Sequence, residues 1–231
     1  MQEPQGLFDI LILIMVRGLP VTLAITLISL SIGFVVGTGL ALLRVYGPKD
    51  LRWIPVVYDR IFRGIPLLVL LFIFGAGLLS YFMWAGSVLG ALFVAGVFAL
   101  ALRSAAYQSE IFRGAIMSVD VGQMQAAQSV GMSNAQATRH IVLPQALRLS
   151  LPGWANEYAV IIKDTSLCGA IGLGDILYHV QAFTWTYPDQ FVAIVMISAI
   201  IYLVFTYPVT KYVGESMTTK LRQLGLGGGK R

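Results

Sequence analysis

The chain has 231 residues, of which 57% are hydrophobic and only 12% are charged. Soluble domains carry roughly 25% charged residues, so this composition excludes a soluble globular protein and predicts an integral membrane protein. The net charge of +5 does not indicate nucleic-acid binding. The basic residues stand at the ends of apolar runs, where lipid headgroups lie, rather than in one patch.

Charge-free apolar runs predict where the chain crosses the membrane, because about 20 residues form one helix across about 30 Å of hydrocarbon. The run 64–102 is long enough for two helices, and its glycines, serines and aromatics predict a turn near 80–87. The whole chain, 1–231, is expected to form a single all-α transmembrane domain with five helices. These spans are predicted at about 18–43, 64–80, 88–112, 143–162 and 190–210.

The lysines and arginines predict the orientation of the chain. Most of them fall on one side of the five spans, and only Arg17 and Lys163 fall on the other. By the positive-inside rule, the N-terminus is outside and the C-terminus is cytoplasmic, as in a multi-pass protein of the cell (inner, cytoplasmic) membrane. The start lacks the basic segment of a cleavable signal peptide, and the glycine-rich tail 225–231 is expected to be mobile.

The polar stretch 120–144, between the third and fourth spans, carries clear helix signals. Asp120 and Ser133 each stand three residues before a glutamine, which is capping-box spacing. Gly131 stands where a left-handed residue would end a helix, and Pro144 is expected to open a new segment. These signals predict a helix-turn-helix on the cytoplasmic face.

Two other interpretations of this stretch are weaker. A DNA-binding helix-turn-helix recruits several Lys or Arg residues to phosphates, whereas Arg139 is the only basic residue besides His140 in 120–142. A purely structural hairpin would explain the caps but not the longer motif described next.

The sequence offers no catalytic or metal-binding set. It has two histidines, a single cysteine, Cys168, which is expected to be a buried spectator, and no phosphate-binding loop. We therefore expect no enzyme activity and no cofactor in this chain, and any energy for active work has to come from another subunit.

The polar stretch resembles the EAA motif of ABC importer permeases, E-A-A-x3-G-x9-I-x-L-P. The spacing matches throughout, and Gln125 stands where the family has glutamate. The flanking segments 106–114 and 143–148 resemble the polar amino acid branch of that family, and the resemblance covers roughly 15–215. The matching residues are Gln125, Ala126, Ala127, Gly131, Ile141, Leu143 and Pro144.

The resemblance implies the transmembrane subunit of an importer for polar amino acids. Its coupling helix, about 133–141, would dock into a cytoplasmic ATPase subunit that holds ATP and Mg. Further implied partners are an extracytoplasmic amino-acid-binding protein, a second permease that is either the same chain or a related one, and membrane lipid, but no nucleic acid. The expected coupling residues are Gln125, Ala126, Ala127, Gly131, Ser133, Asn134, Arg139, His140, Ile141 and Pro144.

Polar residues within the spans are the candidate substrate-binding residues, because ionisable groups inside a membrane usually mark a pathway or an ion pair. Arg103 and Glu110 lie two turns apart on the third span, and Asn156 and Glu157 lie on the fourth. An arginine beside a carboxylate can bind both charged groups of an amino acid. Two alternatives stay open: Arg103 pairs with Glu157, and Glu110 pairs with Arg113 or the polar stretch.

Two further features carry expectations. Asp164 and Asp175 are candidate contacts for the binding protein, since the resemblance implies docking on their side. Gly33, Gly37 and Ala41 recur four residues apart, which favours close packing against a helix or a second subunit. The alternative function, an ATP-independent transporter or channel, would predict internal repeats or a relay of titratable groups, and the sequence has neither.

Overall fold

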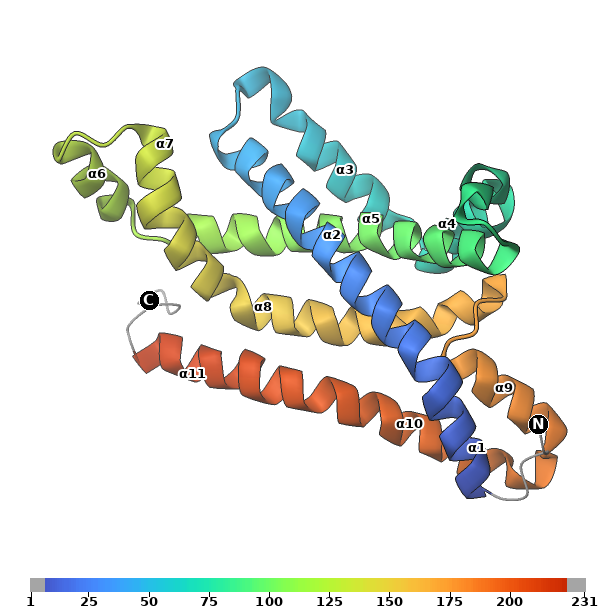
Figure 1. Ribbon diagram of the computed structural model, residues 1–231. Helices are drawn as coiled ribbons and strands as arrows, with labels where there is room; N and C mark the ends of the chain where they lie inside the picture. Colours follow the sequence, from blue (N-terminus) through green and yellow to red (C-terminus); the bar gives the residue numbers. More distant parts are fainter. Residues whose placement is uncertain (1–6, 224–231) are drawn as a thin grey trace.

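The computed structural model describes residues 7–223, and every regular secondary-structure element in this part of the chain is a helix (Figure 1). The predicted mobile tail, 225–231, lies outside the described residues. The α-helices are α1 (Leu7–Leu13), α2 (Leu19–Tyr46), α3 (Trp53–Gly64), α4 (Leu67–Phe72), α5 (Val88–Met117), α6 (Val121–Ser129), α7 (Asn134–Ala137), α8 (Leu143–Asp164), α9 (Ile176–Thr186), α10 (Phe191–Pro208) and α11 (Ser216–Gln223).

Three continuous helical stretches within the described residues are long and apolar enough to cross a membrane. They are Leu7–Tyr46, Val88–Met117 and Pro188–Leu221. The first joins α1 to α2, and the last joins α10 to α11, each through a π-helical turn. A fourth candidate is a bent pair, Lys49–Gly64 followed by Leu67–Gly77, with an angle of 94° between its halves.

The bend between α3 and α4 differs from the uninterrupted span expected over 64–80. Proline disfavours a helical conformation in the residue before it. Accordingly, Ile65 is extended, at φ −87° and ψ 129°, and α4 starts only after Pro66. The turn expected near 80–87 is present as a 3-10 helix, Leu79–Ala85, followed by Gly86 at φ 81°.

Helices α2 and α5 make the closest contact in the core, and two glycines of α2 allow it. A Cβ atom at Gly33 would lie 2.6 Å from the Gln108 amide nitrogen, and one at Gly37 would lie 2.8 Å from the Ala105 carbonyl oxygen. Ala41, one turn further on, is fully buried against a cluster that includes Phe112. The expected role of these small residues in close helix packing is confirmed, and the neighbour is a helix of the same chain.

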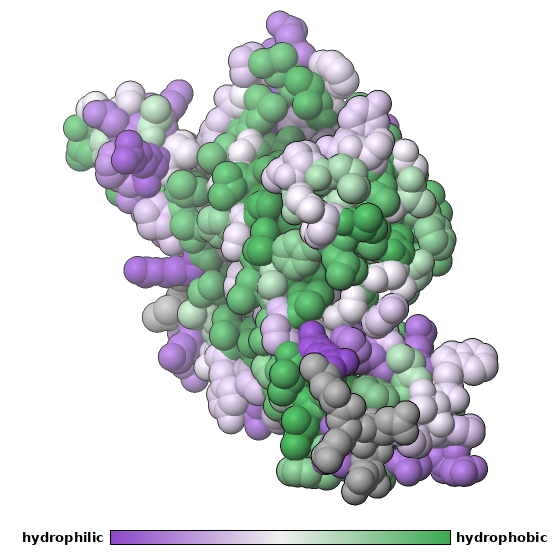
Figure 2. Space-filling model, turned by 45° about the vertical axis from the view of Figure 1, so that its right-hand side comes forward, coloured by the Kyte–Doolittle hydropathy of each residue, from purple (hydrophilic) through white to green (hydrophobic). Residues whose placement is uncertain are grey.

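The surface is apolar in the middle and polar at both ends. Figure 2 shows a broad hydrophobic region across the face in view, with hydrophilic residues on the protruding lobe of α6 and α7 and at the opposite end. Large apolar side chains exposed along the helices include Leu27, Val35, Val192 and Leu203. Such a surface suits a lipid environment, because large contiguous apolar surface is rare on soluble monomers.

Replacing Gly37 with alanine should force α2 and α5 apart. We expect Gly37→Ala to lower the free energy of unfolding by about 1–3 kcal/mol, the usual cost of overpacking a core. Gly39→Ala is the matched control, because a Cβ atom at Gly39 would have nothing within 4 Å. Unfolding in detergent measures both, and equal midpoints for the two variants would contradict the packing argument.

Candidate functional site

One side of α5 holds polar side chains that reach α2. The side-chain amide of Gln108 donates to the Leu30 carbonyl oxygen and to the Ser104 hydroxyl, both at 3.0 Å. Ser29 on α2 donates in return to the Val97 carbonyl oxygen at 3.1 Å. These bonds fix the rotation of α5 and therefore determine which residues point elsewhere.

A second side of α5 faces the end of α8 with an ion pair. Arg103 donates through Nη1 to Asp164 Oδ2, so the two helices are joined by a half-buried ion pair. The Arg103 guanidinium also lies 5.1 Å from the centre of the Tyr107 ring, a cation–π distance. We expected Arg103 either to bind substrate or to pair with Glu157. Its salt bridge is with Asp164 and not with Glu157.

Glu157 lies close to this ion pair but forms no salt bridge with Arg103. Only 3% of Glu157 is exposed, and its carboxyl group interacts with the Ser104 hydroxyl and the Arg103 guanidinium. The neighbouring Asn156 points outward and is exposed. The structure therefore brings Arg103, Glu157 and Asp164 together, whereas Asn156 lies on another face of α8.

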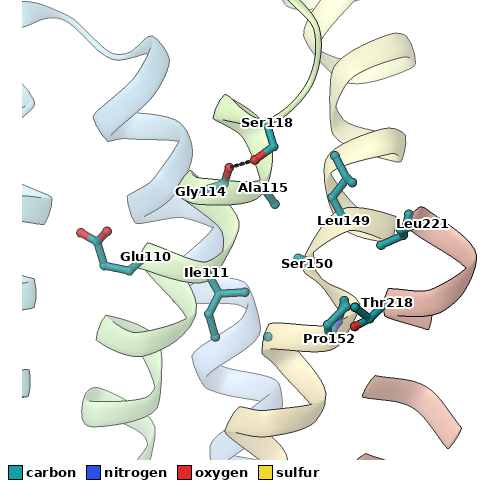
Figure 3. A pocket seen from close by; sticks show the side chains of 11 residues that line it. Glu110, Ile111, Gly114, Ala115, Ser118, Leu149, Ser150, Pro152, Thr218 and Leu221 are labelled. Carbon is teal, nitrogen blue, oxygen red and sulfur yellow. Dashed lines mark hydrogen bonds between the residues drawn. The ribbon is translucent and has the colours of Figure 1, made fainter. Parts of the chain in front are cut away.

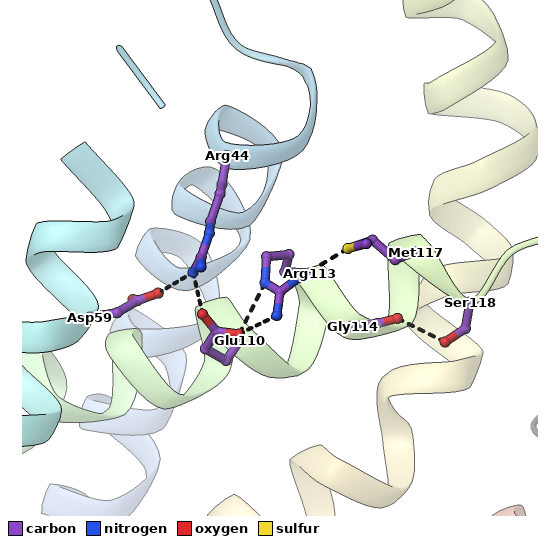
Figure 4. Close-up of polar contacts among 7 residues, drawn as sticks. All are labelled: Arg44, Asp59, Glu110, Arg113, Gly114, Met117 and Ser118. Carbon is purple, nitrogen blue, oxygen red and sulfur yellow. Dashed lines mark hydrogen bonds and ion pairs between the residues drawn. The ribbon is translucent and has the colours of Figure 1, made fainter. Parts of the chain in front are cut away.

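Glu110 belongs to a second ion network, nearer the end of α5 that leads to α6 (Figure 4). Arg44 of α2 donates through Nη1 to Asp59 of α3 at 2.9 Å and also to Glu110. Arg113 donates to the other oxygen of Glu110 through Nε and Nη2, at 3.0 and 2.7 Å. The network joins three helices, and the expected pairing of Glu110 with Arg113 is present.

Two pockets flank this part of α5. One, of about 420 Å³, lies between α5, α8 and α11, and Figure 3 shows the Glu110 carboxylate pointing away from it. Its lining includes the small residues Gly114, Ala115 and Gly153. The other, of about 380 Å³, lies between α2, α3 and α5 and is lined by Arg44, Val56, Asp59, Arg60, Arg63, Gly64, Tyr107 and Glu110. Charged groups gather only at the second of these two pockets.

The polar stretch forms the expected helix-turn-helix with one difference in its caps. Ser133 and Gln136 make a reciprocal capping box, and Gly131 has the left-handed φ of 86°. The Asp120 carboxylate does cap α6, but it accepts from the Gly122 amide rather than completing a box with Gln123. This end of the molecule thus has two short helices with satisfied N-termini.

We expected Pro144 to open a separate segment, but it does not. Residues Asn134–Asp164 form one helical path, in which a π-helical turn, Thr138–Val142, joins α7 to α8. Pro144 falls in the first turn of α8, where its missing amide hydrogen is tolerated. A push on α7 therefore reaches α8 directly.

Most of the expected coupling residues are on the surface of this lobe. The side chains of Gln125, Ser133, Asn134, Arg139 and His140 are exposed, as are Ala126, Gly131 and Pro144. Ala127 is buried, and Ile141 is half-buried. The Gln128 amide donates to the Asn134 side chain at 2.7 Å and so fixes α6 against α7.

The two aspartates expected to face the binding protein have structural partners instead. Asp164 pairs with Arg103, and Asp175 is fully buried at the N-terminus of α9. The Asp175 carboxylate accepts from the Tyr178 amide at 2.9 Å and from the Tyr202 hydroxyl at 3.4 Å. Burial raises the pKa of Asp175 to about 6, which is why its charge needs these donors.

Comparison with known proteins decides the family. Residues 30–214 match the model of the family described as binding-protein-dependent transport system inner membrane component. The chain belongs to this family. Its sequence is 35% identical over 192 residues to the probable glutamine ABC transporter permease protein GlnM of Bacillus subtilis (strain 168), covering 82% of this chain and 85% of that protein.

Two further likenesses agree with that assignment. The nopaline transport system permease protein NocM of Agrobacterium fabrum is 38% identical over 206 residues, which cover 86% of this permease and 84% of NocM. The crystal structure of an amino acid ABC transporter with histidines matches with a TM-score of 0.76 at 32% identity, over 90% of this permease and 94% of that chain. The permease is a subunit of an amino acid ABC importer, and these likenesses support that function over the ATP-independent alternative.

Sequence reasoning missed two members of the ion networks of the permease. Arg44 entered the prediction only as one of the basic residues that set the orientation, and Asp59 did not enter it, because Arg44 lies 15 residues from Asp59 and 66 residues from Glu110. The Arg103 partner Asp164 is 61 residues away. No local pattern indicates such pairings, although the bend at Pro66 hints that α3 turns back over α5.

Removing Arg44 should leave the buried Asp59 carboxylate without its partner. We expect Arg44→Gln to cost about 1–3 kcal/mol of unfolding free energy, less than a fully buried pair, because the Arg44 side chain is 26% exposed. The double variant Arg44→Gln/Asp59→Asn should recover part of that loss. Denaturant unfolding of all variants in detergent measures the coupling, and strictly additive losses would contradict it.

Proposed function

We propose that the permease moves a polar amino acid across the cell membrane by alternating access. An extracytoplasmic binding protein delivers the amino acid, two permease subunits form the path, and two ATPase subunits with bound ATP and Mg supply the energy. The permease itself carries out no chemistry. The second permease subunit is either a copy of this chain or a related chain.

The proposed topology has five crossings, with the N-terminus outside and the C-terminus in the cytoplasm. It is supported by the three long apolar stretches and the bent pair. The fifth crossing is α8, whose 22 residues span about 33 Å at 1.5 Å per residue. The polar residues of α8 keep it below the hydropathy of the other spans, and two of them, Glu157 and Asp164, interact with α5.

The ion pair between Arg103 and Asp164, with Glu157 beside it, is the observation that carries the substrate site. A charged pair inside a membrane is costly unless it serves a path or a partner. A zwitterionic amino acid can replace it group for group: its carboxylate binds the Arg103 guanidinium, and its ammonium group binds Asp164 or Glu157. Glu110 lies about 10 Å further along α5, at 1.5 Å per residue, so it serves the ion network instead.

The coupling function is proposed for the surface of α7 and the turn before it. The capping box and the Gln128–Asn134 bond make this lobe rigid, and the helical path into α8 leads to Glu157 and Asp164. Closure of the ATPases would thus move the same helix that carries two of the three charged site residues. The exposed residues Asn134, Arg139 and His140 are the proposed ATPase contacts.

Charge removal at the site tests the substrate proposal. In proteoliposomes that contain the complete importer, we expect Arg103→Gln and Glu157→Gln to raise the KM for amino acid uptake about tenfold or more, because a charge-assisted contact contributes about 1.5–3 kcal/mol. Arg148→Gln, which removes an exposed charge on the same helix as Glu157, is the control. An unchanged KM and an unchanged ranking of amino acids in both site variants would refute the site.

Gly131 tests the coupling proposal. Its φ of 86° is strained for any residue with a Cβ atom, so Gly131→Val should distort the turn that holds α7. We expect uptake and substrate-stimulated ATP hydrolysis to fall together, while the amount of permease in the membrane stays the same. Gly39→Ala, in a regular helix, should leave both unchanged, and full uptake by Gly131→Val would count against the coupling role.

A further inference from the structure

The pocket between α2, α3 and α5 has both charges of an amino acid recognition site, and it is separate from the pair Arg103–Asp164. Its volume of about 380 Å³ lies in the range of small-molecule sites, roughly 300–1,000 Å³. We call it the vestibule. It lies at the same end of α5 as the ion network, beyond Tyr107 as seen from Arg103.

Two arginines of the vestibule make no salt bridge within the described part of the chain. Arg60 and Arg63 on α3 are exposed, and neither forms an ion pair among residues 7–223. Arg44, by contrast, is occupied by Asp59 and Glu110. Guanidinium groups without a salt bridge keep their donors free for water or for a ligand. They provide a site for a carboxylate.

Asp59 provides the opposite charge. It is only 5% exposed, and one of its oxygens, Oδ1, has no hydrogen-bond partner within the described part of the chain. A buried carboxylate oxygen without a donor is unfavourable, so it indicates a missing partner. An ammonium group of a ligand in the vestibule would supply that donor.

Tyr107 connects the vestibule to the substrate site. The guanidinium groups of Arg63 and Arg103 lie 5.0 and 5.1 Å from the centre of its ring. Arg63 also interacts electrostatically with both Asp59 and Glu157, one carboxylate in each site. A carboxylate that leaves Arg103 therefore meets the next guanidinium beside the same aromatic ring.

We propose that the vestibule is a second amino acid site, through which the substrate passes on its way to the cytoplasm. The substrate carboxylate binds Arg63, assisted by Arg60, and its ammonium group binds Asp59 Oδ1. The inference rests on the proposed function of Arg103, Glu157 and Asp164 as the first site. An amino acid thus moves between two sites of the same chemistry, and neither site has to hold it tightly.

Equilibrium binding to the complex of permease and ATPases in nanodiscs, without the binding protein, tests the proposal. The probes are radiolabelled L-glutamine, L-arginine and L-histidine, and the probe that binds the wild-type complex is carried forward. We expect two bound molecules per wild-type permease. The variants Arg63→Gln and Arg103→Gln should each bind one. Lys49→Gln, which removes a basic residue outside the vestibule, should keep both.

Uptake kinetics distinguish the two sites. Arg63→Gln should lower kcat about three- to tenfold with little change in KM, whereas Arg103→Gln should raise KM. Arg63→Lys should restore part of the rate, and the unfolding midpoint of Arg63→Gln should match the wild type, because no ion pair is lost.

Four outcomes would overturn the vestibule site. If Arg63→Gln retains both bound molecules, or if the wild-type complex binds one molecule that Arg103→Gln removes, the second site is wrong and the first one stands. If the second molecule binds in nanodiscs of phosphatidylcholine alone but not in nanodiscs that contain phosphatidylglycerol, the vestibule holds anionic lipid in the membrane. If neither Arg63→Gln nor Arg103→Gln changes binding, both sites fail.

Discussion

Several polar side chains of α5 lie where water is scarce, and these side chains have partners on other helices. This constraint determines the polar contacts between α5 and its neighbours. Gln108 reaches the backbone of α2, Arg103 reaches α8, and Glu110 reaches Arg44 on α2. In hydrocarbon an unpaired polar group costs several kcal/mol, which makes these bonds specify how the helices are rotated. The close contact at Gly33 and Gly37 adds a steric constraint to these bonds.

The same constraint explains why the charged groups are arranged in two clusters. Arg103 with Asp164 and Glu157 lies between α5 and α8, and Glu110 with Arg44 and Asp59 lies between α5, α2 and α3. Helix α8 continues into α7, and α5 leads to α6, so both helices end in the lobe proposed to meet the ATPase. In the proposed coupling, motion of that lobe would reach Glu157 and Asp164 through the continuous helical path of α7 and α8, whereas the non-helical residues 118–120 join α6 to α5.

The sequence was sufficient where the signal was local. The capping box at Ser133, the left-handed Gly131 and the small residues Gly33 and Gly37 each follow from neighbouring residues and occur as expected. Pro144 was misjudged, because a proline is tolerated in the first turn of a helix as well as after a break. Ion-pair partners could not be predicted at all. Arg103 had a plausible acid in Glu157, and the choice of Asp164 depends on the rotation of α8, which the whole packing decides.

Gln125 separates what the permease needs in order to fold from what it needs in order to work with others. Its side chain is exposed and makes no hydrogen bond with the described part of the chain, whereas its backbone carbonyl accepts from Ser129 at 3.0 Å. Exchanging glutamate for glutamine here therefore leaves the architecture of the subunit untouched. Under the proposed coupling function, the missing negative charge at this position therefore changes the surface that the lobe offers to an ATPase and leaves the packing of the permease as it is.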